Sequence, residues 1–558
     1  MGIPSYFSYI VKNYPHILSK FVSRERAIDN LYLDCNSILY DVYHRLVALD
    51  KAEKSVVPLV VPLVVPLVVP LPDRIIQGTI HKIHEYIELV GPRKTVYIAF
   101  DGVAPVAKID QQRSRRYKSW YQSEVTKHIY ATETDEPKKN SNKTNINDDW
   151  STLAITPGTN FMNQLDAQIN LEFASNRQTS SREIIVGGSR GAGEGEHKLF
   201  DYIRQNPEKH KNETTVVYGL DADLIVLSIC HLNYSPNLFL FRESPHFHME
   251  NLDPNANYLL DINRLAQVID IDTHDYIVLT FLLGNDFLPH FPALNIRTGG
   301  MDKLLIAYRD LFTKNTKDTK DTKAHLTLAI SGKQTIHWLN MHRFIAVLSK
   351  MEEKYIQEEH KLRNRREYVF PERTADERFK KFESTPTFDR TLEKYISPFH
   401  QTWQQRYYAS LFPRSSKIEN SNLVKDVVQN YCEGLEWNLQ YYTHSCPDWR
   451  WTYKYSYPPL LQDFHAFLEN ACPVVILNGN NKPFSQLTQL CCVLPKAGLK
   501  YLPVELQTKL LENHSRWYDT NCRFLWAYCR YFWESHVVME HIDMEAMETL
   551  INETKLKK

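Results

Sequence analysis

The sequence of 558 residues has no net charge, because 66 lysine and arginine side chains balance 66 aspartate and glutamate side chains. Global charge therefore does not predict a polyanionic partner, and any nucleic-acid site must be a local basic patch. Apolar residues make up 43% of the chain and charged residues 24%, which is ordinary for a soluble globular protein. The length allows two or more domains and a large core.

The sequence also lacks any C-x-x-C spacing among its nine cysteines. An odd number of cysteines without this spacing predicts neither a disulfide framework nor a zinc knuckle. We expect reduced, mostly buried thiols in an intracellular protein.

Targeting and membrane signals are missing as well. The segment MGIPSYFSYIVKNYP has no basic stretch followed by a long apolar core, and Tyr6 stands where a myristoylation motif requires Ser or Thr. Residues 56–71 are four copies of VVPL, but a proline at every fourth position removes helix hydrogen bonds, so they do not predict a membrane span. We interpret residues 56–72 as an extended low-complexity insertion. We expect a cytoplasmic protein without a membrane partner, with a nuclear or viral-factory location as the alternative.

Acidic residues follow several short apolar runs that are typical of buried strands. The runs and their acids are 31–33 with Asp34, 95–100 with Asp101, 183–187 with Glu194 and Glu196, and 215–218 with Asp221 and Asp223. Asp286 is a seventh such acid and follows the apolar helix predicted from residue 276 to Gly284. Helical patterns between the runs predict an α/β fold with a mainly parallel sheet flanked by helices.

The acids are expected to meet, since ligands bind at the carboxyl ends of parallel strands. Two unit charges about 4 Å apart repel each other by about 4 kcal/mol at an effective dielectric constant of 20, so a cation should be bound among them. Hard oxygen ligands without a Cys or His cluster favour Mg²⁺ or Mn²⁺ over zinc. For Asp34 taken alone, a role as helix N-cap is equally consistent with the sequence.

A second set of polar residues shares one face of the helix predicted after Asp101. These residues are Lys108, Gln112, Arg115 and Arg116. Such a face suits a phosphate group, because Arg offers planar forks and Lys a point charge. A solvated basic face is the alternative, and the spacing by itself slightly favours it.

The remaining regions carry weaker signals. Residues 132–150 are polar and residues 313–323 are a slipped TKD repeat, so both are predicted as loops. The charged stretch 352–367 is predicted as a solvated helix. The last 160 residues are rich in aromatic rings, most of which should be core, although one or two at the edge of a groove would suit base stacking.

Seven ordered blocks resemble the XRN family of 5′→3′ exoribonucleases, which are related to flap endonucleases and PIN-like nucleases. The blocks are MGIPSYF, LYLDCNSILY, FDGVAP with QQRSRR, ITPGTNFM, GEGEHK, YGLDADLI and LLGNDFLP, and EGLEW, the Trp-rich Pro segment and KPFSQL resemble the family's second conserved region. The resemblance covers most of residues 1–310 and about 430–500.

The resemblance implies a function for each set of residues. The acids Asp34, Asp101, Glu194, Glu196, Asp221, Asp223 and Asp286 would bind two Mg²⁺ ions, and the basic face would bind the 5′-monophosphate of single-stranded RNA. RNA would then be hydrolysed processively to nucleoside 5′-monophosphates during RNA decay, by a monomer working with decapping or decay factors. Tyr40 stands where several relatives have a base-stacking His, the second stacking ring would be Trp449 or Trp451, and Ala192 replaces a Pro common before GEGEHK.

The resemblance also implies a domain organisation, with a PIN-like nuclease domain in residues 1–312 and a mostly helical second region. That region would comprise a repeat loop and charged linker in 313–400 and an aromatic-rich part in 401–558 that packs on the nuclease domain. The other functions considered are a structure-specific flap-type DNA endonuclease and a non-catalytic protein that binds RNA 5′ ends.

Overall fold

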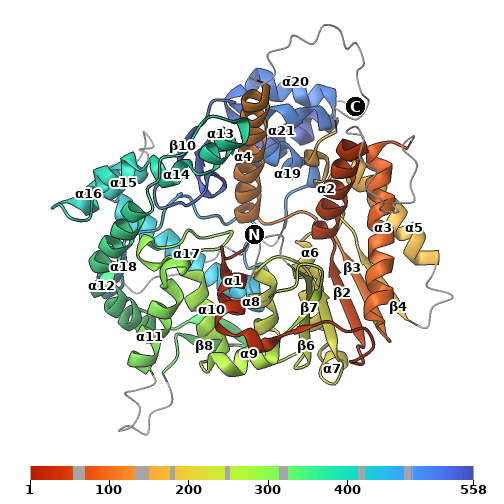
Figure 1. Cartoon of the computed structure of the whole chain (residues 1–558), viewed down its shortest axis with the longest axis horizontal. Coiled ribbons are helices and arrows are strands. Elements are labelled where there is room, and N and C mark those ends of the chain that lie inside the picture. The colour runs from red at the N-terminus through yellow and green to blue at the C-terminus, as the bar shows by residue number, and fades with distance from the viewer. Residues whose placement is uncertain are drawn as a thin grey trace.

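The structure is a computed structural model that describes residues 2–53, 69–131, 150–175, 182–244, 252–312, 324–412, 422–470, 479 and 482–556 (Figure 1). Within these residues, no helix is long and apolar enough to cross a membrane.

A seven-stranded sheet organises the first half of the chain in the order β1-β7-β6-β5-β2-β3-β4. The four pairings from β6 to β4 are parallel, and only the pairings of β7 with β6 and β1 are antiparallel. This confirms the predicted mainly parallel α/β fold. The strands are β1 Leu18–Lys20, β2 Asn30–Asp34, β3 Thr95–Ala99, β4 Glu183–Gly187, β5 Thr215–Tyr218, β6 Leu238–Glu243 and β7 Asn257–Asp261.

Helices cover both faces of this sheet, which explains why β2 and β5 are buried along their whole length and are apolar apart from their end residues. One core cluster joins β2, β3 and β5 to α2, α3 and α5; in Figure 1, α2 lies above β2 and β3, and α3 and α5 lie at the right side of the molecule. The helices are α1 Tyr6–Asn13, α2 Asn36–Glu53, α3 Leu71–Val90, α4 Val106–Ala131, α5 Asn160–Ser175, α6 Gly195–Gln205, α7 Pro207–His210, α8 Asp223–Cys230, α9 Ile262–Ile269, α10 Thr273–Phe281 and α11 Gly300–Phe312.

The second half is mostly helical, as predicted, and it also contains two small two-stranded sheets that were not predicted, β8-β9 and β10-β11. A second core cluster runs without interruption from α1 and α8 on the other face of the sheet into α12, α16, α17 and α18. The elements are β8 Thr327–Ile330, β9 Lys333–Ile336, α12 Trp338–Arg365, α13 Ala375–Glu383, α14 Thr385–Phe388, α15 Thr391–Ile396, α16 Trp403–Leu411, α17 Leu423–Thr443, α18 Leu461–Asn470, α19 Gln486–Val493, α20 Val504–Asn513, β10 Arg523–Leu525, β11 His536–Val538 and α21 Met544–Leu556.

Two local predictions need correction. Leu71 and Pro72 form the first turn of α3, so the low-complexity insertion does not extend through residue 72 in an extended form; a proline fits there because the first helical N–H groups need no intrahelical acceptor. The charged helix is not simply solvated, since one face of α12 buries Glu352, Glu359 and Arg363. Residues 56–68, 132–149 and 313–323, where the sequence predicts loops, lie outside the described residues.

Candidate active site at the carboxyl end of the sheet

The predicted acids lie at the carboxyl ends of four adjacent parallel strands. Asp34 is the last residue of β2 and Asp101 follows β3 by two residues. Glu194 and Glu196 stand at the start of α6, and Asp223 is the first residue of α8, where helix macrodipoles favour negative charge. Asp286 follows α10 and joins the other acids from the turn after this helix. Gly284 lies in that turn and has a φ of 82°.

Electrostatic coupling links all seven acids. Burial and the charges of Asp101 and Asp221 raise the pKa of Asp34 well above its usual value. Burial and Glu194 do the same for the pKa of Glu196, to which Asp223 and Asp34 also contribute. The charge of Asp286 in turn acts on Asp223, so the seven acids form one centre.

The pKa of Asp223 shows how strongly these acids repel one another. Burial and the nearby charge of Asp286 raise the pKa of Asp223 to about 7. Without a further cation, part of the centre must hold protons near neutral pH. Among the described residues, the one ammonium group placed between two of these acids belongs to Lys108.

Lys108 extends from α4 into the centre. Its Nζ lies 2.5 Å from Oε2 of Glu194 and 2.8 Å from Oδ2 of Asp286. Burial would lower the pKa of Lys108, but Asp286 and Glu194 raise it well above its usual value. Burial alone would raise the pKa of Asp286, and Lys108 instead holds it well below the usual range. Lys108 was expected in the phosphate pocket, whereas it lies between two of the acids.

Asp101 is held by backbone and amide donors. The Gly195 N–H donates to Oδ1 of Asp101 over 2.7 Å, and the Asn36 amide donates to Oδ2. In return, the Asp101 N–H donates to Oδ1 of Asn36 over 3.3 Å. Asn36 was not identified from the sequence, although its position two residues after Asp34 is a usable signal.

The acids have unused ligand capacity that fits a hard cation. Within the part of the chain that is described, the buried Oδ1 atoms of Asp34 and Asp223 accept no hydrogen bond. Buried carboxylate oxygens normally have partners, and an orphaned pair in an acidic centre matches the oxygen ligands that Mg²⁺ and Mn²⁺ prefer. The donor set therefore fits a divalent metal.

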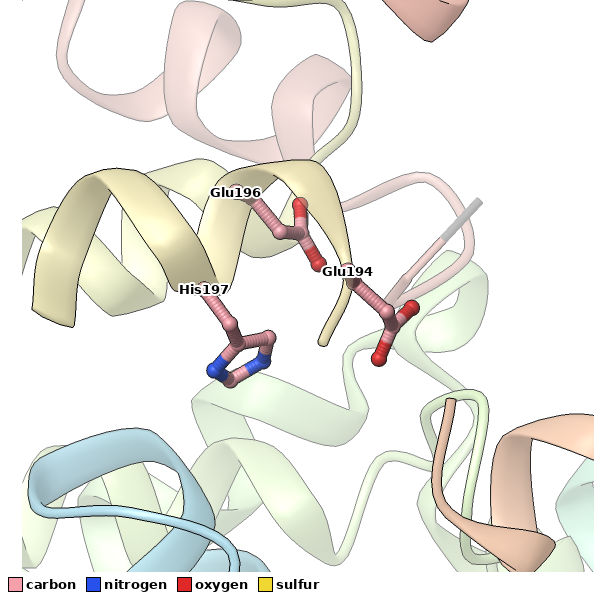
Figure 2. A group of neighbouring side chains, drawn as sticks. All are labelled: Glu194, Glu196 and His197. Carbon is pink, nitrogen blue, oxygen red and sulfur yellow. The ribbon is translucent and has the colours of Figure 1, made fainter. Parts of the chain in front are cut away.

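Figure 2 shows Glu194 and Glu196 with His197, all at the start of α6. One ligand atom from each of the three lies within 4.8 Å of the others. Burial holds the pKa of His197 well below its usual value, so its ring is neutral. The ring stacks on Tyr441, with 3.8 Å between ring centroids, so it also packs against α17.

The other predicted phosphate ligands continue along α4. Gln112 is buried, and its Oε1 accepts no hydrogen bond from the described residues. Arg116 donates to the backbone oxygen of Ile155 over 3.2 Å. Arg115 is coupled electrostatically to Tyr40 and to Asp286, so the basic face borders both a ring and the acidic centre. Lys108 and Gln112 on this face are buried, whereas Arg115 and Arg116 are partly exposed.

The two candidate tryptophans differ in their surroundings. Trp451 is 9% exposed and stacks on Trp437 with 5.2 Å between centroids, as a core ring does. Trp449 is partly exposed, and its carbonyl accepts a hydrogen bond from the Val106 N–H over 3.0 Å, which ties it to the start of α4.

Comparison with known proteins matches both halves of the chain. The family model described as the XRN 5′–3′ exonuclease N-terminus matches residues 1–244, and the model described as the Xrn1 helical domain matches residues 265–396 and 389–553.

Among similar proteins, 5′–3′ exoribonuclease 1 of Homo sapiens is 26% identical over 98% of this chain and 34% of its own length. The Schizosaccharomyces pombe protein of that name is 26% identical over 92% of this chain and 45% of its own length. Gallus gallus 5′–3′ exoribonuclease 2 is 24% identical over 99% of this chain and 70% of its own length. The chain thus spans less than half of the first two relatives. Together with the acidic centre, these matches show that the chain belongs to the XRN 5′–3′ exonuclease family.

Proposed function

We propose that the protein is a 5′→3′ exoribonuclease that removes nucleoside 5′-monophosphates one at a time from 5′-monophosphorylated RNA. The proposal rests mainly on helix α4. Its Lys108 lies among the acids, and its Arg115 and Arg116 lie beside them. A phosphate bound by the arginines would hold the RNA end at a fixed distance from the acids. That distance determines which phosphodiester is cleaved.

The seven acids are the proposed holders of two divalent metal ions, Mg²⁺ or Mn²⁺. When bound, such ions lower the pKa of a ligated water and stabilise the departing oxygen. The chain's own residues prepare the site: Gly195 and Asn36 orient Asp101, and Lys108 reduces the repulsion between Glu194 and Asp286.

The basic face is the proposed reader of the 5′ end. Arg115 and Arg116 offer guanidinium forks that pair with phosphate oxygens through charge-assisted hydrogen bonds. The buried Gln112 adds amide hydrogen-bonding groups beside them. A 5′-hydroxyl would leave the arginines unpaired, and a cap or triphosphate would place extra groups in the pocket.

Tyr40 and Trp449 are the proposed stacking rings for the first bases. Tyr40 is close enough to Arg115 and Arg116 to affect the pKa of both. A ring at this position would stack on the base attached to the held phosphate, whatever its identity. We prefer Trp449 to Trp451 because the ring of Trp451 is already packed in the core.

The proposed setting is RNA decay in the cytoplasm, with the protein acting as a monomer and with decapping or decay factors supplying monophosphorylated ends. The predicted division at residues 312 and 400 likewise stays a proposal.

The test uses 3′-labelled RNA with a 5′-monophosphate, 5′-hydroxyl or 5′-triphosphate, incubated with the protein in Mg²⁺. We expect rapid loss of the monophosphorylated RNA only. Release of longer fragments from a DNA flap would instead indicate the endonuclease, and tight binding of monophosphorylated RNA without turnover would indicate a 5′-end-binding protein. Either result would contradict the proposal.

A further inference from the structure

Tyr441 connects the helical half of the chain to the acidic centre. This residue of α17 donates its hydroxyl to Oε1 of Glu194 over 2.8 Å, although the two residues are 247 positions apart in the sequence. Tyr441 is 3% exposed, so the hydrogen bond is shielded from water. None of the seven acids comes from the elements that follow α11.

The ring of Tyr441 is held on several sides. It stacks on His197 with 3.8 Å between ring centroids, packs at a tilt against Trp437 at 4.6 Å, and meets Phe287 edge-on at 5.5 Å. His197 adjoins Glu196, and Phe287 adjoins Asp286. Because ring contacts fix the torsion angles of a buried tyrosine, they also fix the direction of its hydroxyl.

Glu194 consequently has one defined partner for each oxygen. Oε1 accepts from Tyr441, and Oε2 pairs with Lys108. A carboxylate that ligates a metal through one oxygen needs the other to be held, and such outer partners typically contribute 10- to 100-fold to metal affinity or activity. Hydrogen bonds to a charged acceptor are also stronger than neutral ones.

We propose that Tyr441 is a positioning residue that orients the Glu194 carboxylate for metal binding, so that the helical half of the chain completes the acidic centre. The inference rests on the proposed function only in treating Glu194 as a metal-binding acid. It identifies a physical reason why the nuclease half needs α17: without the hydroxyl, one oxygen of a buried carboxylate would have no fixed partner.

The test is Tyr441→Phe in the full chain, which keeps the ring stacking and removes the hydroxyl. Calorimetric titration with Mn²⁺, without RNA, should show affinity weakened by about 10- to 100-fold. With RNA, kcat should fall at low Mg²⁺ and recover at high Mg²⁺, while KM for RNA stays unchanged. Tyr407→Phe is the matched control, because this buried hydroxyl donates to the Pro458 carbonyl over 2.9 Å. Its ring contacts are Tyr408, Phe412 and Tyr528, none of which contacts the ring of Tyr441.

A second comparison separates positioning from packing. In a Glu194→Gln background, Tyr441→Phe should cause no further loss of Mn²⁺ affinity. A further tenfold loss in that background, or unchanged Mn²⁺ affinity of Tyr441→Phe alone, would overturn the proposal. Failure of the proposed function would look different: the wild type would leave RNA intact, while the Mn²⁺ titration would still distinguish Tyr441→Phe from Tyr407→Phe.

Discussion

The ammonium group of Lys108 lies 2.8 Å from the carboxylate of Asp286, and the two form a buried ion pair. The resemblance assigned these residues to different tasks, one to phosphate binding and the other to metal binding. Their contact places a cation of the proposed phosphate pocket beside an acid of the proposed metal site. Binding of either a phosphate or a metal ion would therefore change the charge around the Lys108 ammonium group.

Lys108→Met should destabilise the metal-free protein by about 3–5 kcal/mol, because it leaves Glu194 and Asp286 buried without their cationic partner. Denaturant unfolding in EDTA measures this change. Mg²⁺ should then stabilise the variant more than the wild type, since the centre is more negative. Lys94→Met, which removes a lysine that is 52% exposed, is the control. Equal stability of the Lys108→Met variant and the wild type in EDTA would contradict the assigned role of Lys108.

Arg116→Ala should reduce the preference for a 5′-monophosphate over a 5′-hydroxyl by about 10- to 100-fold. This reduction corresponds to the free energy of one or two hydrogen bonds to a charged group. The measurement is the ratio of kcat/KM for the two RNA ends. Arg93→Ala is the control, since Arg93 is 59% exposed and pairs with Asp29 at the opposite end of the sheet. An equal loss on both RNA ends would count against the phosphate pocket.

Gly2→Ala should slow RNA cleavage by about 100-fold, the effect of moving a catalytic group by about 1 Å. Gly2 has a φ of 46°, and a Cβ there would overlap the Asp223 carboxylate. Gly91→Ala is a matched control, because Gly91 also has a positive φ of 62° but its Cβ would meet no atom within 4 Å. If both variants lose activity equally, backbone strain alone explains the effect.

Glu352 should make stability depend on pH. Burial raises the pKa of Glu352 to about 8 from an ordinary 4.5, although the N–H groups of Leu461 and Gln462 donate to its carboxylate. The folded protein thus keeps a proton that the unfolded chain releases. This contribution to stability is complete below about pH 4.5 and decreases up to about pH 8, by about 1.4 kcal/mol per pH unit.

Denaturation midpoints between pH 5 and 8 test this prediction. Glu352→Gln should gain stability relative to the wild type as the pH rises, because glutamine has no proton to lose. Glu353→Gln, at the exposed neighbouring position, should follow the wild-type profile. A constant difference between Glu352→Gln and wild type across this range would show that Glu352 does not titrate as described.

Much of the fold was predictable because strand ends and acids coincide in the sequence. The run ending at Asp34 and the run ending at Asp101 became neighbouring parallel strands, which brought the acids together as expected. Strands β1, β6 and β7 were missed, since nothing chemically distinctive follows them. The exposure of the charged helix α12 was overestimated, because Glu352 is buried and accepts hydrogen bonds from backbone N–H groups at the start of α18, which is distant in the sequence.

Contacts between segments that are distant in the sequence could not be predicted from the sequence. The hydrogen bond from Tyr441 to Glu194 depends on how α17 packs against α6, and residue spacing does not encode that packing. The place of Lys108 among the acids is similar, since helical spacing grouped it with Arg115 and Arg116 but did not reveal what faces its ammonium group. The assignment of each residue to metal, phosphate or base stays a prediction.

The most direct test of the central claim is the release of labelled mononucleotide from 5′-³²P-labelled RNA in Mg²⁺, under single-turnover conditions. Wild type and Asp253→Ala, which changes an acid paired with Lys20 on the surface, should release the labelled mononucleotide equally fast. Asp223→Ala should keep its fold but release the mononucleotide more than about 100-fold more slowly. Such a loss exceeds the roughly 10- to 100-fold typical of removing a residue that only hydrogen-bonds a metal ligand. Near-normal release by Asp223→Ala would contradict the assignment of these acids to metal-dependent hydrolysis.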